Sequence, residues 1–246
     1  MTAERLVAHR GFQHCYPENT LAAIHGAIDA GALNIELDVL FSADGEPVIY
    51  HDATLERVSG VAGSVHQFTL TELAKIPASE AGRLGQQFAS ESIAPLAALI
   101  PVMQQHPHIR FFVEAKRSGL KQVGQEFALN KLLGLLTPVQ AQVVCISFDK
   151  PFVAAARQQD WPLVGMVLES WDDLGHLLIA DTSPEYLFCS QRHIPDGQLP
   201  TLPHSKWVIY EIGDSKGAID WFQRGADMVE TFNIGGLLKE LDNNSL

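Results

Sequence analysis

Residues 34–51 read NIELDVLFSADGEPVIYH, and this stretch decides the fold that we predict for the chain. Strand-like apolar patterns cover 34–39 and 47–51, with an Asp-Gly turn signal between them. Only residues 40–46 separate the two strands, whereas a parallel crossover needs about a dozen residues or more. We therefore expect segment 47–51 to return as the antiparallel arm of a hairpin.

Short apolar, β-branched runs alternate with helix-patterned stretches along the whole chain, as in repeated βα units around a parallel sheet. Apart from the hairpin arm, strands are predicted at residues 5–9, 34–39, 110–115, 142–148, 163–168, 186–190, 207–212 and 226–231. Eight βα units in 246 residues have the size and rhythm of a (β/α)8 barrel. The prediction is thus an α/β chain that forms one (β/α)8 domain over residues 1–246, with a doubly wound open sheet as the alternative.

One segment, residues 52–93, interrupts this rhythm directly after the hairpin arm that ends at His51. Four glycines lie among its polar residues, and one short helix is indicated near residues 71–75. We predict that the segment is a small insertion.

Composition excludes several kinds of partner. A hydrophobic content of 46% with 19% charged residues indicates a large buried core. The net charge of −12 argues against nucleic acid, because binding to a phosphate backbone depends on Lys and Arg. No apolar run approaches the roughly 20 residues of a membrane helix, and the N-terminus lacks a signal-peptide pattern. The expectation is a cytoplasmic protein without an integral membrane segment; the oligomeric state is not specified.

Three carboxylates are expected to meet at one end of the barrel. Glu36 and Asp38 are two residues apart in a strand and leave the same face, and Glu114 lies near the end of strand 110–115. Buried carboxylates are unfavourable unless they are paired or bound to metal. A carboxylate set without sulfur favours one hard divalent cation, Mg²⁺ or Ca²⁺. Taken singly, each carboxylate is also explained by a salt bridge or a solvated strand end.

Two histidines and two basic residues are expected beside these carboxylates. His9 ends strand 5–9 and His51 ends the hairpin arm, and histidine exchanges protons near neutral pH. This placement favours a general acid and a general base. Arg10 and Lys116 add positive charge for a phosphate, or else pair with the carboxylates.

Five short motifs together resemble the glycerophosphodiester phosphodiesterase family in order and spacing. They are His9-Arg10-Gly11, Pro17-Glu18-Asn19-Thr20, Glu36-x-Asp38, His51-Asp52 and Glu114-x-Lys116, with Ser147-Phe148 as a weaker match. The resemblance implies a TIM barrel with a small insertion after the His-Asp pair. It also implies a small-molecule substrate, a glycerophosphodiester. A metal-dependent reaction would hydrolyse this substrate to glycerol 3-phosphate and an alcohol.

The resemblance assigns roles to individual residues. It implies the following set: His9 and His51 as the acid and base; Glu36, Asp38 and Glu114 as metal ligands; Arg10 and Lys116 as phosphate contacts; and Tyr210 as an aromatic substrate contact. Whether water or a neighbouring substrate hydroxyl attacks the phosphorus is left open.

The chain departs from the family pattern at two places in its second half. Where the family usually has Trp-Thr-Val-Asn, this chain has Tyr210-Glu211-Ile212-Gly213. Where the family ends with Thr-Asp-x-Pro, this chain has Thr231-Phe232-Asn233-Ile234. Glu211 and Glu230 therefore bring acidic groups near the barrel mouth. Two alternatives stay open: a lysophospholipase D-like enzyme with an apolar groove, and a non-catalytic barrel that binds a phosphorylated ligand. The groove would be lined by Phe12, Tyr16, Tyr210 and Phe232.

Overall fold

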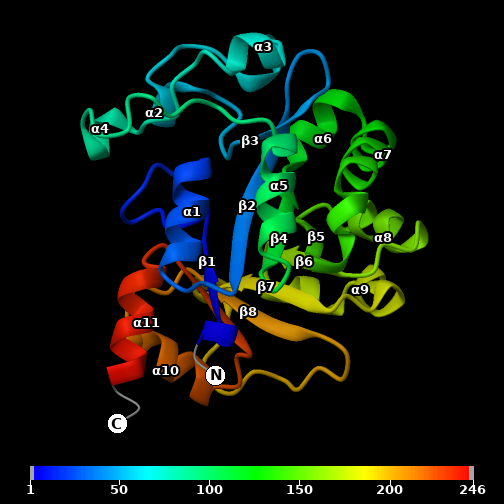
Figure 1. Cartoon of the computed structure of the whole chain (residues 1–246). Helices are drawn as coiled ribbons and strands as arrows, with labels where there is room; N and C mark the ends of the chain where they lie inside the picture. The colour runs from blue at the N-terminus through cyan, green and yellow to red at the C-terminus, as the bar shows by residue number, and fades with distance from the viewer. Residues whose placement is uncertain (1–2, 244–246) are drawn as a thin grey trace.

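The computed structural model describes residues 3–243 and forms a closed barrel of eight parallel strands with one extra antiparallel strand (Figure 1). The strands are β1 Leu6–Ala8, β2 Asn34–Phe41, β3 Pro47–Ile49, β4 Arg110–Ala115, β5 Val143–Ser147, β6 Val164–Leu168, β7 Tyr186–Ser190, β8 Lys206–Tyr210 and β9 Met228–Thr231. β1 pairs in parallel with both β2 and β9, which closes the sheet. The predicted (β/α)8 architecture is confirmed, and the open-sheet alternative is wrong.

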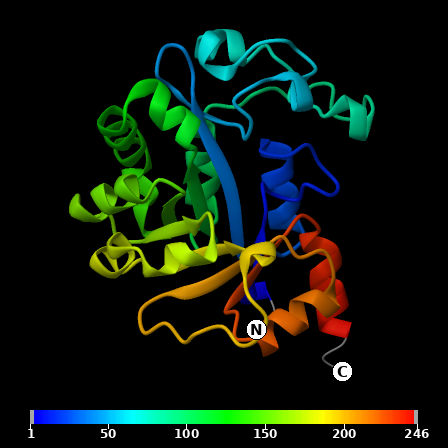
Figure 2. The ribbon, with the colours of Figure 1, turned by 180° about the vertical axis from the view of Figure 1, so that it is seen from behind.

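The helices surround the strands in both views (Figure 1, Figure 2). They are α1 Leu21–Asp29, α2 Glu56–Ser59, α3 Leu70–Leu73, α4 Ala81–Leu84, α5 Ile100–Gln105, α6 Arg117–Val123, α7 Gln125–Leu136, α8 Lys150–Gln158, α9 Leu177–Thr182, α10 Ser215–Gln223 and α11 Ile234–Asn243. None of the helices within residues 3–243 has both the length and the apolar character that crossing a membrane requires.

The predicted hairpin is present. β3 runs antiparallel to β2, with Phe41 opposite Pro47 and Val39 opposite Ile49. The β3 ladder ends before His51, although the Tyr50 N–H still donates to the Asp38 carbonyl oxygen at 3.0 Å. The arm runs back from the end of β2, so His51 follows a residue that is level with Asp38 and lies on an arm outside the barrel.

Alternation along each strand divides the core into two layers. On β2, Ile35, Leu37 and Val39 face outward and pack in the layer between the strands and the helices. The inward side chains form a second cluster inside the barrel. At its centre Phe112 contacts Tyr186 and Phe188 edge to face, with ring centroids 4.9 and 5.2 Å apart. These three rings, which we call the aromatic layer, fill the middle of the barrel.

The segment between β3 and α5 lies at the end of the barrel where β2 finishes (Figure 1). It contains three short helices, α2, α3 and α4, where the sequence indicated one. Apolar side chains of α2, α3 and the connecting loops form a small core together with Leu40, Val48 and Tyr50 of the hairpin. The segment also binds to the barrel through Glu80, whose carboxylate accepts a 2.7 Å hydrogen bond from the Glu18 N–H.

Candidate active site

A cavity of about 220 Å³ lies at the carboxyl ends of the barrel strands. Its lining includes all eight residues predicted for the site: His9, Arg10, Glu36, Asp38, His51, Glu114, Lys116 and Tyr210. They come from β2, β4 and β8 and from the segments that follow β1, β3 and β4. The structure thus brings together residues more than 200 positions apart, whereas their chemical roles stay predictions.

The three carboxylates converge as strand geometry requires. Glu36 and Asp38 point from β2 into the barrel, and Asp38 is the register partner of Glu114 on β4. One oxygen from each of these three carboxylates lies within 4.8 Å of the other two. A second group, His9, Glu36 and Glu230, meets the same limit.

Burial and crowding make these carboxylates unlike ordinary surface acids. Burial, followed by the nearby Asp38 charge, raises the pKa of Glu36 well above its usual value. Burial likewise raises the pKa of Glu114 to about 7. Burial opposes ionisation of Asp38 too, but the charges of Lys116 and Arg10 outweigh it and hold the pKa of Asp38 below its usual range.

The two basic residues pair with the carboxylates in this structure. The Lys116 ammonium lies 3.2 Å from Asp38 Oδ1 and 2.9 Å from Glu114 Oε1. Arg10 Nε lies 3.1 Å from Asp38 Oδ2, and Arg10 Nη1 donates to Glu18 Oε1 at 3.0 Å. This is the pairing alternative noted from the sequence, and it places both cations inside the cavity.

His9 is buried beside the acidic group. Its Nε2 lies 3.7 Å from Glu36 Oε2 and its Nδ1 lies 3.7 Å from Glu211 Oε1. The ring stacks on Phe232, with centroids 4.7 Å apart and planes inclined by 13°. Burial, followed by the Arg10 charge, lowers the pKa of His9 well below its usual value, which favours the neutral ring.

His51 is held by a chain of charged groups. Its Nδ1 lies 2.5 Å from Asp52 Oδ1, and Arg57 Nε donates to Asp52 Oδ2 at 2.6 Å. Arg57 also binds both oxygens of the buried Glu18 carboxylate. Burial lowers the pKa of His51, and the hydrogen bond to Asp52 works in the opposite direction. Because Asp52 occupies Nδ1, Nε2 is the nitrogen left to exchange a proton.

Two further polar residues at the site, Asn19 and Glu230, were not among the predicted site residues. Asn19 and Asp38 form two hydrogen bonds. Asn19 Nδ2 donates to Asp38 Oδ2 at 2.8 Å, and the Asp38 backbone N–H donates to Asn19 Oδ1 at 3.0 Å. Glu230 lies on β9 with only 3% of its surface exposed, and it lines the cavity. The sequence placed Glu230 near the barrel mouth without assigning it a role, and its position two residues after Met228 in an apolar strand predicts that its carboxylate points inward.

The apolar side of the cavity is built mostly by residues other than the four aromatic ones expected for the lipid alternative. Of the four aromatic residues expected there, Tyr210 lines the cavity. Phe12 and Tyr16 pack against each other instead, and Tyr16 also contacts Phe88 in the insertion. The apolar wall is built by Ile146, Phe148, Val167 and Phe188.

The model of the glycerophosphoryl diester phosphodiesterase family matches residues 9–195. The chain belongs to this family. Glycerophosphodiester phosphodiesterase 1 of Homo sapiens is 31% identical over 180 residues, which cover 73% of this chain and 53% of that protein. A glycerophosphodiester phosphodiesterase of Caldanaerobacter subterraneus is 43% identical over 91 residues, 37% of each chain. The chain spans about half the length of the first of these relatives.

Solved structures of similar proteins share the fold. A phosphodiesterase from Oleispira antarctica, in complex with the product sn-glycerol-3-phosphate, superposes with a TM-score of 0.82 at 24% identity, over 98% of this chain and 100% of the other. A glycerophosphodiester phosphodiesterase from Agrobacterium tumefaciens gives 0.74 at 21% identity, over 96% and 99%. The family match over residues 9–195 includes every motif found in the first half of the chain. The departures at Tyr210 and Phe232 lie outside the matched residues.

Proposed function

We propose that this chain is a metal-dependent glycerophosphodiester phosphodiesterase that hydrolyses its substrate to glycerol 3-phosphate and an alcohol. One observation supports this most strongly: a single cavity is lined by three convergent carboxylates, two histidines and two cationic side chains. Membership of the family supports the same reaction. The product named for the Oleispira antarctica protein is consistent with it.

The residues present fit a hard divalent cation. Glu36 Oε1 is buried and has no hydrogen-bond partner among residues 3–243, so it is available to a metal. We assign Glu36, Asp38 and Glu114 as the ligands, because their oxygens converge and oxygen donors suit Mg²⁺ and Ca²⁺. A bound cation would polarise the phosphate and lower the pKa of the attacking hydroxyl.

The two histidines divide the proton transfers. His9 is neutral and buried, which suits acceptance of a proton from the attacking hydroxyl. His51, whose Nδ1 faces the Asp52 carboxylate, suits donation from Nε2 to the leaving alcohol. The Asp52 charge favours the protonated ring and opposes the burial that lowers the pKa of His51.

Arg10 and Lys116 neutralise charge on the phosphate. Their N–H groups already line the cavity, and charge-assisted hydrogen bonds to phosphate oxygens are among the stronger polar contacts in proteins. Tyr210 forms one wall beside them, against which the alcohol portion of the substrate would pack.

The test is a phosphodiesterase assay on glycerophosphocholine, glycerophosphoethanolamine and lysophosphatidylcholine, with Mg²⁺, Ca²⁺ or EDTA. We expect glycerol 3-phosphate from the first two substrates and no turnover after chelation. Activity that survives thorough chelation would refute the metal mechanism. Preferential cleavage of lysophosphatidylcholine would favour the lysophospholipase D-like alternative, and binding without turnover would favour the non-catalytic one. A transient cyclic phosphate would identify the neighbouring hydroxyl as the nucleophile.

A further inference from the structure

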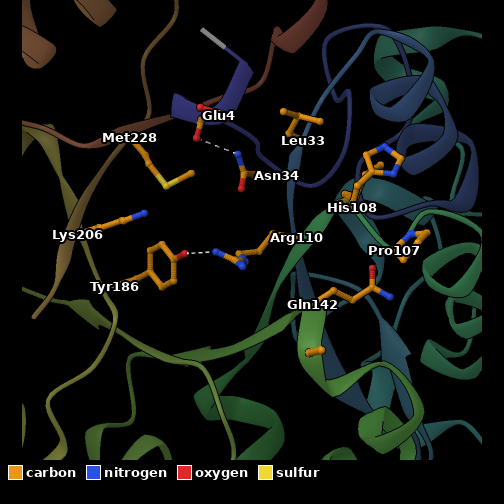
Figure 3. A pocket seen from close by; sticks show the side chains of 12 residues that line it. Glu4, Leu33, Asn34, Pro107, His108, Arg110, Gln142, Tyr186, Lys206 and Met228 are labelled. Carbon is orange, nitrogen blue, oxygen red and sulfur yellow. Dashed lines mark hydrogen bonds between the residues drawn. The ribbon is translucent and has the colours of Figure 1, made fainter. Parts of the chain in front are cut away.

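A second cavity, of about 350 Å³, opens at the opposite end of the barrel (Figure 3). It is framed by the first residues of five strands: Asn34 of β2, Arg110 of β4, Tyr186 of β7, Lys206 of β8 and Met228 of β9. The register explains the convergence, because Asn34 pairs with Arg110 and Tyr186 pairs with Lys206. These five side chains are therefore brought together by barrel closure and not by a flexible loop.

Two cations face this cavity without an acidic partner. Arg110 Nη1 donates to the Tyr186 hydroxyl at 2.6 Å, and the Arg110 guanidinium and the Lys206 ammonium each lie 6.0 Å from the Tyr186 ring centroid. Among the ion pairs of residues 3–243, none involves Arg110 or Lys206, although the chain has 29 acidic and 17 basic residues. Arg110 Nε is buried and has no acceptor in the described part of the chain.

Other polar groups at the cavity also have unused hydrogen-bonding capacity. Gln142 is buried, with 9% of its surface exposed. Its Nε2 donates to the Met103 carbonyl oxygen, but its Oε1 is buried and has no partner within residues 3–243. The Tyr186 hydroxyl accepts from Arg110 and keeps its own proton to donate. Glu4 is an exposed acidic residue in the lining. The cavity therefore offers several donors and more positive than negative charge.

We propose that this cavity binds a small phosphate monoester. A guanidinium with free N–H groups binds phosphate oxygens in a bidentate manner, and an ammonium adds a point charge. The volume is larger than a bare phosphate needs and lies within the roughly 300–1,000 Å³ of small-molecule sites.

The aromatic layer separates this cavity from the candidate active site. Phe188 lines the active-site cavity, Tyr186 lines the second cavity, and Phe112 contacts both rings. A ligand at the amino end therefore does not reach the carboxylates along the barrel axis. In barrels of this architecture chemistry takes place at the carboxyl end, so the second cavity is a binding site and not a second centre of catalysis.

Met228 provides a local probe, because it lines the second cavity and is one of four methionines. The experiment labels the methionine methyl groups with ¹³C, assigns Met228 with Met228→Leu, and titrates the intact chain with inorganic phosphate, sn-glycerol 3-phosphate or glycerol. We expect a saturable Met228 shift with sn-glycerol 3-phosphate, a weaker one with inorganic phosphate and none with glycerol. Equal affinity for the two phosphates would limit the site to free phosphate and overturn the monoester assignment.

Charge-removing variants make the test specific. Arg110→Gln should weaken the titration by about tenfold or more, since hydrogen bonds to charged groups contribute roughly 1.5–3 kcal/mol. Lys206→Gln, at an exposed position, should weaken it in the same direction without disturbing the fold. Lys75→Gln removes one charge from the exposed surface of the insertion and should leave the affinity unchanged. A titration that is identical in wild type and Arg110→Gln, or a Met228 signal that never shifts, would overturn the proposal.

Discussion

Asp38 on β2 and Glu114 on β4 are register partners, so two buried carboxylates stand side by side at the carboxyl end of the barrel. The Lys116 ammonium contacts both, at 3.2 and 2.9 Å. Without a metal, Lys116 compensates part of their charge, together with Arg10, which lies 3.1 Å from Asp38. Lys116 is the one cation that contacts both carboxylates among residues 3–243, so the stability of the metal-free chain should depend strongly on it.

Lys116→Gln should therefore destabilise the chain in EDTA by about 3 kcal/mol, the usual result of leaving buried charge without its partner. Denaturant unfolding at pH 7 measures the change. Lys131→Gln is the matched control, because Lys131 pairs with Glu46 at the surface, where an ion pair contributes about 1 kcal/mol or less. Similar losses in both variants would contradict the buried role of Lys116.

Divalent cations should stabilise the wild-type chain. At a concentration 100 times the Kd, binding to the folded state alone adds about 2.7 kcal/mol. A thermal shift with Mg²⁺ or Ca²⁺ measures this, and Glu36→Gln should abolish it. Glu126→Gln, on the exposed surface of α7, should keep the full shift. A cation-dependent shift that survives in Glu36→Gln would exclude Glu36 as a ligand.

In the absence of metal, Glu36→Gln should stabilise the chain. The folded pKa of Glu36 is raised, so its contribution to stability is present below the usual glutamate pKa, about 4.3, and is lost as the pH rises through the raised value. In EDTA at pH 8 the Gln variant should thus be more stable than wild type, and the advantage should shrink toward pH 4. Equal stability at pH 8 would show that the carboxylate carries no burial penalty.

The histidines should be needed for turnover and not for folding. His9→Ala and His51→Ala should each lower kcat by about 10²–10⁴-fold, the range for loss of a general acid or base. Asp52→Asn should lower kcat less, because it removes only the group that orients His51. His25→Ala, exposed on α1, is the control. Near-normal kcat in His51→Ala, with an unchanged melting temperature, would remove His51 from the mechanism.

Glu18 should contribute to stability in a pH-dependent way. Burial opposes its ionisation, but hydrogen bonds from Arg57 and the charge of Arg10 outweigh burial and lower the pKa of Glu18. A lowered folded pKa gives stability that is present above about pH 4.3 and is lost as the pH falls through the folded value. Glu18→Gln should therefore cost roughly 1–3 kcal/mol at pH 7 and much less at pH 3. Urea unfolding at the two pH values tests this, and a loss that does not depend on pH would contradict it.

The strands were largely predictable because their apolar runs are short and buried on both sides. The predicted bounds of β4 and β7, residues 110–115 and 186–190, agree with the structure. β8 ends earlier than predicted, at Tyr210. Ile212 is nevertheless buried, and its N–H bonds to the Glu230 carbonyl oxygen, so it extends the apolar pattern beyond the regular ladder.

The insertion and the outer contacts of the site were less predictable. A four-residue helix such as α2 or α4 contains hardly more than one turn, too short for a periodic apolar pattern to identify. The inward side of β2 followed from the spacing of Glu36 and Asp38, but the chain from Glu18 through Arg57 to Asp52 depends on how the insertion packs against the barrel. Contacts over 39 positions leave no local signal in the sequence.

The aromatic layer of Phe112, Tyr186 and Phe188 also makes the molecule electrically polar along the barrel axis. The mouth on one side of these rings is dominated by carboxylates, and the mouth on the other side by Arg110 and Lys206. The apolar rings between them exclude water, which would otherwise screen the charges of the two mouths from each other. In the metal-free chain, cations are thus drawn to the carboxylate end and anions to the opposite end; a divalent cation bound at the carboxylates would reverse this preference at the active site.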